Sequence, residues 1–168
     1  MVLAMIPVVG DDAKWGSDAY WMGEALAQAR MASAIEEVPV GAIVVSAVEV
    51  ISRACNRNRT DNDPCAHAEI LALRQAAQQI GNYRLTDTTL FVTLEPCFMC
   101  AGAIIHARVK RVVFAAYDHR AGAVGSLANI LQTPMLNHVC EVTAGVREEE
   151  SVALLQSYFQ QRRTGGLL

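Results

Sequence analysis

A strand-to-helix junction over residues 88–107, TTLFVTLEPCFMCAGAIIHA, decides the fold of this chain. Residues 88–94 are rich in β-branched and aromatic side chains and predict a strand. Pro96 ends that strand and begins a helix over residues 97–107. Cys97 and Cys100 lie three residues apart on one side of the helix start. The partial positive charge of a helix N-terminus favours thiolate over thiol, so the junction predicts a pair of metal-binding sulfurs.

A second helix start, in the stretch Cys65-Ala66-His67-Ala68-Glu69, carries the matching nitrogen ligand. Apolar residues recur at helical spacing over residues 66–80, and Gly81 ends the pattern. The 30 residues between His67 and Cys97 are enough for a helix, a turn and a strand, so the two helix starts can meet. One histidine and two cysteines can hold a zinc ion and leave its fourth position open for water.

Glu69 lies two residues after His67 and need not be a ligand, so its carboxylate is free to move protons. In a regular helix these two side chains would diverge by roughly 200°. Both can face one substrate only if His67 approaches the metal from the first turn. The pattern then predicts hydrolytic removal of an amine, in which Glu69 takes a proton from water, delivers it to a ring nitrogen and afterwards returns a proton to the leaving amine.

A structural zinc site is the plainer alternative for these residues. Such a site recruits four protein ligands, and Cys65 or His106 could supply the fourth. A lone Cys-x-x-Cys could also be a redox pair. The combination of His-x-Glu, a strand that ends in Glu-Pro, and Cys-x-x-Cys is far more specific than any of its parts and favours the catalytic site.

The rest of the chain predicts an α/β domain with a mixed sheet and helices on both faces. Residues 17–163 form this single domain, between a loose extension over residues 1–16 and a short tail over 164–168. Residues 56–64 and 117–126 are predicted loops. The remaining predicted elements are a helix over 18–35 capped by Ser17, strands over 39–46, 49–55, 111–116 and 139–142, and a last helix over 147–163.

Composition and charge narrow the class of protein. The chain has 168 residues, of which 52% are hydrophobic and 18% charged, which is typical of one globular domain. No apolar run reaches the roughly 18 residues of a membrane helix, and the short apolar start does not favour a secretory signal. The five cysteines suit a reducing, cytoplasmic compartment. Although the net charge is −3, residues 51–120 carry nine basic and six acidic groups, which suggests a local patch for a phosphate backbone.

Together these motifs resemble the bacterial tRNA-specific adenosine deaminases, within the cytidine-deaminase-like fold. The zinc motif marks the superfamily, and flanking stretches mark this branch. The stretches that carry the resemblance are EVPVGA (37–42), HAEI (67–70), NYRL (82–85), TLEPCFMCAGA (93–103), AGAVGS (121–126) and Asn137-His138. The resemblance implies a three-layer α/β/α fold with a mostly five-stranded mixed sheet. It also implies a homodimer with one zinc ion per subunit.

The same resemblance implies that adenosine becomes inosine at the wobble position of a tRNA anticodon. It assigns zinc to His67, Cys97 and Cys100, and proton transfer to Glu69. It implies that Asn56 contacts the purine and that the backbone of Ala68 meets the edge of the base. The residues it implies for contact with the anticodon arm are Asp118, Arg120, Phe159, Arg162 and Arg163. The residues alone instead favour a core position for Phe159 and merely solvated side chains for the two arginines.

Two other functions remain open from the sequence. A deaminase of a free nucleobase or nucleoside would use identical zinc chemistry and differ only in its pocket. A catalytically silent zinc-binding or RNA-binding module would not need the carboxylate of Glu69.

Overall fold

A computed structural model describes residues 14–164 of the chain. Most of the predicted extension over residues 1–16, and the tail apart from Thr164, lie outside these residues. The described elements are α1 (Asp18–Ala34), β1 (Gly41–Ser46), β2 (Glu49–Cys55), α2 (Ala68–Ile80), β3 (Thr88–Leu94), α3 (Phe98–His106), β4 (Arg111–Ala116), β5 (Glu141–Thr143) and α4 (Glu148–Thr164). No helix among them is long and apolar enough to cross a membrane.

The strands form one five-stranded sheet in the order β2-β1-β3-β4-β5. β1 pairs antiparallel with both β2 and β3, whereas β3, β4 and β5 run parallel to one another. This arrangement confirms the predicted mixed sheet. Because β3 and β4 are parallel, their carboxyl ends lie at the same edge, where ligands bind in open α/β sheets.

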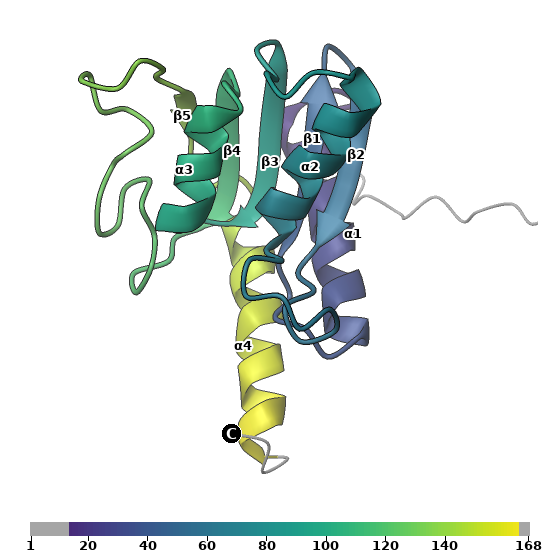
Figure 1. The fold of residues 1–168 in the computed structure, drawn as a ribbon. Helices are drawn as coiled ribbons and strands as arrows, with labels where there is room; N and C mark the ends of the chain where they lie inside the picture. Colours follow the sequence, from purple (N-terminus) through teal and green to yellow (C-terminus); the bar gives the residue numbers. More distant parts are fainter. Residues whose placement is uncertain (1–13, 165–168) are drawn as a thin grey trace, which may run out of the picture.

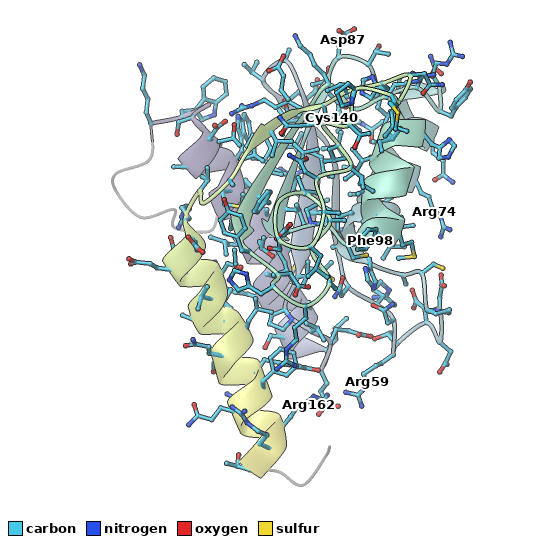
Figure 2. The ribbon with its side chains drawn as sticks, turned by 90° about the vertical axis from the view of Figure 1, so that its left-hand side faces the viewer. Arg59, Arg74, Asp87, Phe98, Cys140 and Arg162 are labelled. Carbon is cyan, nitrogen blue, oxygen red and sulfur yellow. The ribbon has the colours of Figure 1, made fainter. Side chains whose placement is uncertain are left out.

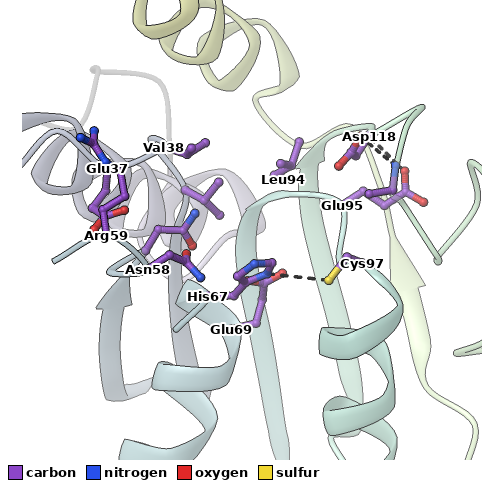
Figure 3. A pocket seen from close by; sticks show the side chains of 13 residues that line it. Glu37, Val38, Asn58, Arg59, His67, Glu69, Leu94, Glu95, Cys97 and Asp118 are labelled. Atoms are coloured by element: carbon purple, nitrogen blue, oxygen red, sulfur yellow. Dashed lines mark hydrogen bonds between the residues drawn. The ribbon is translucent and has the colours of Figure 1, made fainter. Parts of the chain in front are cut away.

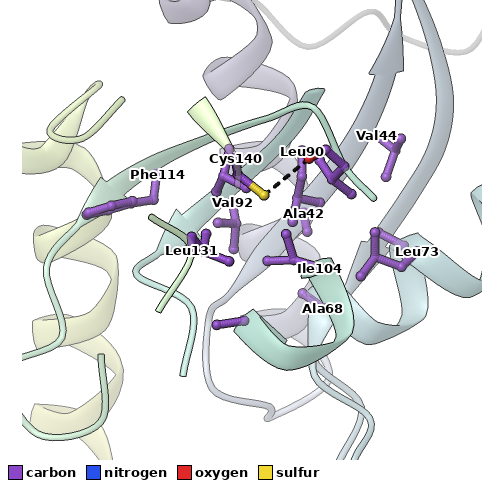
Figure 4. Packing of buried hydrophobic residues seen from close by; sticks show 14 of the residues in the cluster. Ala42, Val44, Ala68, Leu73, Leu90, Val92, Ile104, Phe114, Leu131 and Cys140 are labelled. Carbon is purple, nitrogen blue, oxygen red and sulfur yellow. Dashed lines mark hydrogen bonds between the residues drawn. The ribbon is translucent and has the colours of Figure 1, made fainter. Parts of the chain in front are cut away.

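Helices cover both faces of the sheet, which confirms the three-layer fold (Figure 1). Ile43 and Val45 point from β1 toward α1, while the alternate residues Ala42 and Val44 point toward α2 and α3. Figure 4 shows this second core, where Ile104 of α3 packs among the sheet residues. α4 shares the α1 face, and its last turns extend beyond the edge of the sheet (Figure 1).

Several predicted boundaries differ from the structure by one or two residues. β1 begins at Gly41 and not at Pro39, which has no N–H to donate to a strand. β5 covers residues 141–143 because its pairing with β4 starts at Glu141. α4 covers 148–164, one residue later than predicted at each end. α2 begins at Ala68, not at residue 66, because His67 keeps an extended backbone with ψ 149°.

Caps and turns explain where several elements start and stop. The Ser17 side chain accepts a hydrogen bond from the N–H of Tyr20 at 3.2 Å, which confirms the predicted cap of α1. Gly81 ends α2 with a φ of 72°, a conformation that glycine adopts at little cost. The β1–β2 turn uses Ala47 at a φ of 52°, without the Asn-Gly or Asp-Gly usual in such hairpins.

Candidate active site

Two helix N-termini meet at the carboxyl edge of the sheet. His67 is the N-cap residue of α2, and Cys97 is the N-cap residue of α3. Both have extended backbones, and neither side chain caps its own helix. The two capping side chains are therefore available to each other and to a ligand between the helices.

The distances between these side chains fit a zinc ion. His67 Nδ1 lies 3.7 Å from Cys97 Sγ and 3.4 Å from Cys100 Sγ, and all three ligand atoms lie within 4.8 Å of one another. In a tetrahedral zinc site, with bonds of about 2.0 Å to nitrogen and 2.3 Å to sulfur, neighbouring ligand atoms are about 3.6 Å apart. Within residues 14–164, neither Cys65 nor His106 joins this group, so three ligands stand where a structural site would have four.

The thiols of Cys97 and Cys100 have pKa values shifted in opposite directions. A hydrogen bond from Cys100 lowers the pKa of Cys97 to about 3, and the same contact raises the pKa of Cys100. The hydrogen bond to Cys97 in turn raises the pKa of His67. One sulfur is thus already a thiolate next to an imidazole. Zinc takes thiolates as ligands, so this donor set suits a divalent cation.

Glu69 lies in the first turn of α2 and faces the same cavity as His67 and Cys97 (Figure 3). Its side chain is only 4% exposed, and burial raises its pKa to about 7. His67 precedes the helix, so the divergence expected for a regular helix does not apply. A carboxyl group with a pKa near neutrality can both accept and donate a proton.

The cavity has a volume of ≈ 320 Å³. It is lined by Glu37, Val38, Val40, Asn56, Asn58, Arg59, His67, Glu69, Leu94, Glu95, Cys97, Asp118 and Ala121. Asn56 Oδ1 accepts a hydrogen bond of 2.8 Å from the N–H of Ala68, which leaves the Nδ2 group of Asn56 to donate to a ligand. Since that N–H is engaged, the contact between the Ala68 backbone and a base stays a prediction.

Glu95 belongs to a motif that the sequence singled out, but its role was missed. Its carboxylate is 2% exposed and accepts hydrogen bonds from the N–H groups of Asp118 (3.0 Å), Val124 (3.0 Å) and Ser126 (2.9 Å), and from the Ser126 hydroxyl. A side chain at Gly122 would overlap this carboxylate. Burial acts to raise the pKa of Glu95, but these hydrogen bonds outweigh it and lower the pKa. Glu95 therefore shapes the loop after β4, and the only sequence signal for it is its place before a proline at the end of a predicted strand.

A larger groove of ≈ 760 Å³ adjoins the cavity and shares Val38, Leu94 and Asp118 with it. Three of the residues predicted to contact RNA line this groove with Asp118: Arg120, Phe159 and Arg163. Phe159 is 42% exposed, so it is not a core residue. The structure does not bring Arg162 to this groove. Its Nη2 donates to the carbonyl of Glu36 at 2.8 Å, and its role in RNA contact stays a prediction.

A His/Cys/Cys group with a buried carboxylate beside it, at the edge of a three-layer α/β/α fold, defines the class of zinc-dependent deaminases of nucleobases. Comparisons with known proteins agree. Residues 16–116 match the family described as "Cytidine and deoxycytidylate deaminase zinc-binding region".

Two curated relatives are tRNA-specific adenosine deaminases. The protein of Haemophilus influenzae is 49% identical over 147 residues, 87% of this chain and 85% of the relative. That of Bacillus subtilis is 44% identical over 146 residues, 87% of this chain and 91% of the relative. The chain therefore belongs to the cytidine and deoxycytidylate deaminase family, on the branch of the tRNA-specific adenosine deaminases.

Solved structures of deaminases are also similar to this chain. One, from a study of A-to-I editing by tRNA:A34 deaminases at the wobble position of transfer RNA, has a TM-score of 0.78 and 43% identity, and the match covers 81% of this chain and 99% of that one. A guanine deaminase from Nitrosomonas europaea has a TM-score of 0.73 and 25% identity over 94% of this chain and 95% of its own.

Proposed function

We propose that the protein hydrolytically deaminates adenosine to inosine at the wobble position of a tRNA anticodon. The observation that carries this proposal is the groove of ≈ 760 Å³ that continues from the cavity, because a free base would need no such extension. Identities of 49% and 44% to tRNA-specific adenosine deaminases support it, against 25% to the guanine deaminase. We propose the tRNA anticodon arm as the partner.

We propose that His67, Cys97 and Cys100 hold one zinc ion per subunit. Zinc bound there supplies Lewis acidity, which lowers the pKa of a water molecule to about 7. The carboxylate of Glu69 accepts a proton from the attacking water and delivers it to a ring nitrogen of the base. It then takes the second proton from the oxygen that has added to the carbon, which becomes the carbonyl, and passes that proton to the exocyclic amine as the C–N bond breaks and ammonia leaves. The buried position of Glu69 keeps its pKa near 7, which suits both directions of transfer.

The other site residues bind and orient the substrate in this proposal. The Nδ2 group of Asn56 donates to the purine, and Ala68 holds Asn56 through its N–H. In the groove, Phe159 stacks on a splayed base, while Arg120 and Arg163 contact phosphates. Asp118 stands where cavity and groove join, so we expect it beside the nucleotide next to the target.

We also propose that the protein is a homodimer that works in the cytoplasm, where tRNA is found. An apolar groove of ≈ 390 Å³ between α2 and α3, lined in part by Ile70, Leu73 and Ala103, supports an interface on this face. Sedimentation equilibrium tests this expectation, and a monomer at micromolar concentration would contradict it.

The decisive experiment incubates zinc-loaded protein with an RNA anticodon arm that carries adenosine at the wobble position. Inosine is measured by nuclease digestion and mass spectrometry. We expect inosine from this arm, none from an arm with that adenosine moved by one position, and far less from the first arm with Glu69→Gln. Free guanine, cytosine and adenosine are tested in parallel. Turnover of a free base without inosine in RNA would favour the nucleobase deaminase, and no turnover of any substrate would favour the silent module.

A further inference from the structure

Three side chains from two distant segments converge on one main-chain oxygen, the carbonyl of Glu36. Arg59 Nη1 donates to it at 2.9 Å, the Tyr158 hydroxyl at 3.1 Å, and Arg162 Nη2 at 2.8 Å. Arg59 comes from the loop between β2 and α2, whereas Tyr158 and Arg162 come from α4. Figure 2 shows Arg59 and Arg162 at the same end of the molecule. One oxygen thus joins the loop to the C-terminal helix.

The backbone at Glu36 explains why this carbonyl is available. Glu36 has a φ of 61°, a left-handed conformation that is uncommon for residues other than glycine. Its N–H donates to the carbonyl of Ser33, and the next N–H donates to that of Ala32, so the turn is locked to the end of α1. A strained turn of this kind persists only where the surrounding contacts hold it.

The next residue, Glu37, holds the same loop from the other side. Its side chain is 2% exposed, and Oε1 accepts hydrogen bonds from the N–H (2.6 Å) and the hydroxyl (2.9 Å) of Thr60. Asn58 and Arg59, which directly precede Thr60 in the chain, line the catalytic cavity, and Figure 3 shows Glu37 and Arg59 together at its edge. The turn at residues 36–37 therefore holds one wall of the cavity.

Arg162 and Arg163 are neighbours in α4 but have different surroundings. Arg163 is exposed and lines the groove proposed for RNA. Arg162 is half-buried, and its guanidinium lies 5.0 Å from the centre of the Tyr158 ring. Among the described residues, no carboxylate lies within ion-pair distance of Arg162, so its fixed partners are the Glu36 carbonyl and an aromatic face.

We propose that Arg162 is a positioning residue, which with Tyr158 and Arg59 couples the docking of α4 to the wall of the catalytic cavity through the Glu36 carbonyl. This inference rests on the proposed function, because α4 lines the RNA groove while the loop lines the base cavity. Binding of RNA along α4 then stabilises the loop that surrounds the target base. The guanidinium acts through the protein and not through its charge on RNA.

Hydrogen exchange of the zinc-loaded protein tests the coupling without any substrate. Arg162→Gln replaces the guanidinium of one α4 donor with a shorter amide, and Tyr158→Phe removes the other donor without a change in charge. We expect both variants to raise the exchange rate of amides in residues 56–64 by roughly two- to tenfold, as for the loss of one net hydrogen bond. The matched control, Arg163→Gln, should leave exchange in this loop as in the parent protein. Unchanged exchange in both test variants would overturn the proposal.

Kinetics with the anticodon arm separate positioning from RNA contact. We expect Arg162→Gln and Tyr158→Phe to lower kcat at saturating RNA with little change in KM or its salt dependence. Arg163→Gln should raise KM and reduce the salt slope by about one. If Arg162→Gln instead behaves like Arg163→Gln, Arg162 is an RNA contact and the proposal is wrong. A protein that forms no inosine would contradict the proposed function, while the exchange measurement would still decide the coupling.

Discussion

The floor and the rim of the active site differ in the elements that supply their residues and in how exposed those residues are. The floor consists of His67, Glu69, Cys97 and Cys100, which all lie at the caps or first turns of two helices and are buried or half-buried. The rim along the groove combines a loop after β4 with α4, and its residues Arg120, Phe159 and Arg163 are exposed. In the proposed function, the floor performs a reaction common to many deaminases, whereas the rim selects the substrate. Changes to the floor should therefore abolish chemistry, and changes to the rim should alter recognition.

The largest effect is expected from Cys97→Ala, which removes one of the three proposed zinc ligands. With two ligands left, zinc content should fall well below one ion per subunit and inosine formation should fall to background. Elemental analysis after dialysis measures the metal. The matched control is Cys65→Ala, which changes a nearby cysteine outside the ligand group and should keep its zinc. Full zinc occupancy in Cys97→Ala would show that the floor is assembled differently.

Glu69→Gln should come next, because it keeps the shape of the side chain but cannot accept a proton. We expect kcat to fall by about 10²- to 10⁴-fold while zinc content and affinity for the anticodon arm are retained. Single-turnover kinetics and fluorescence anisotropy measure the two quantities. If the variant kept most of the parent kcat, Glu69 would not be the group that transfers the proton.

Glu95→Gln tests the link between floor and rim. The amide would turn an NH₂ group toward N–H donors of the loop after β4, so at least one hydrogen bond is lost. Urea unfolding should report a loss of about 1–3 kcal/mol in the free energy of unfolding, and kcat/KM should fall about tenfold. Ser126→Ala removes only one donor and should cost about 1 kcal/mol. Equal stability of Glu95→Gln and the parent protein would show that the loop keeps its conformation without these hydrogen bonds.

The smallest effect is expected from Phe159→Ala at the rim. Loss of a partly exposed stacking surface should weaken binding of the anticodon arm by about 1 kcal/mol, or fivefold in Kd, with kcat nearly intact. Phe159→Leu keeps the bulk of the side chain but not its aromatic face, so it should bind the anticodon arm almost as weakly as Phe159→Ala does. If leucine binds like phenylalanine, the contact is apolar packing and not stacking.

The floor could be predicted from sequence because its geometry is mostly local. A strand that ends at Pro96 must deliver Cys97 to a helix start, and the three-residue spacing fixes Cys100 beside it. The first residue of α2 was harder, because Ala66 and His67 are both compatible with a helix. The extended backbone of His67 became evident only in the folded chain, and it is what lets His67 and Glu69 face one cavity.

The supports of the rim and of the cavity walls could not be predicted, because their partners are distant in sequence. Glu95 holds N–H groups 23 to 31 residues away, and Glu37 holds Thr60 23 residues away. Arg162 and Arg163 are identical residues at adjacent positions of one helix, so composition cannot say which of them faces the groove. They are separated by about 100° around the helix axis, and this separation gives them different surroundings only once α4 has docked on the sheet.

By itself, the sequence determined the secondary elements, the group of residues proposed to hold zinc and the carboxylate proposed to move protons. Caps, apolar periodicity and ligand spacing depend on residues that are close together in the sequence, so they can be recognised without the fold. Only the tertiary structure decided that Glu95 and the turn at residues 36–37 hold opposite walls of the cavity, and that Arg162 turns away from the groove. These contacts depend on how α4 and two loops pack against the sheet, and that packing is a property of the whole fold.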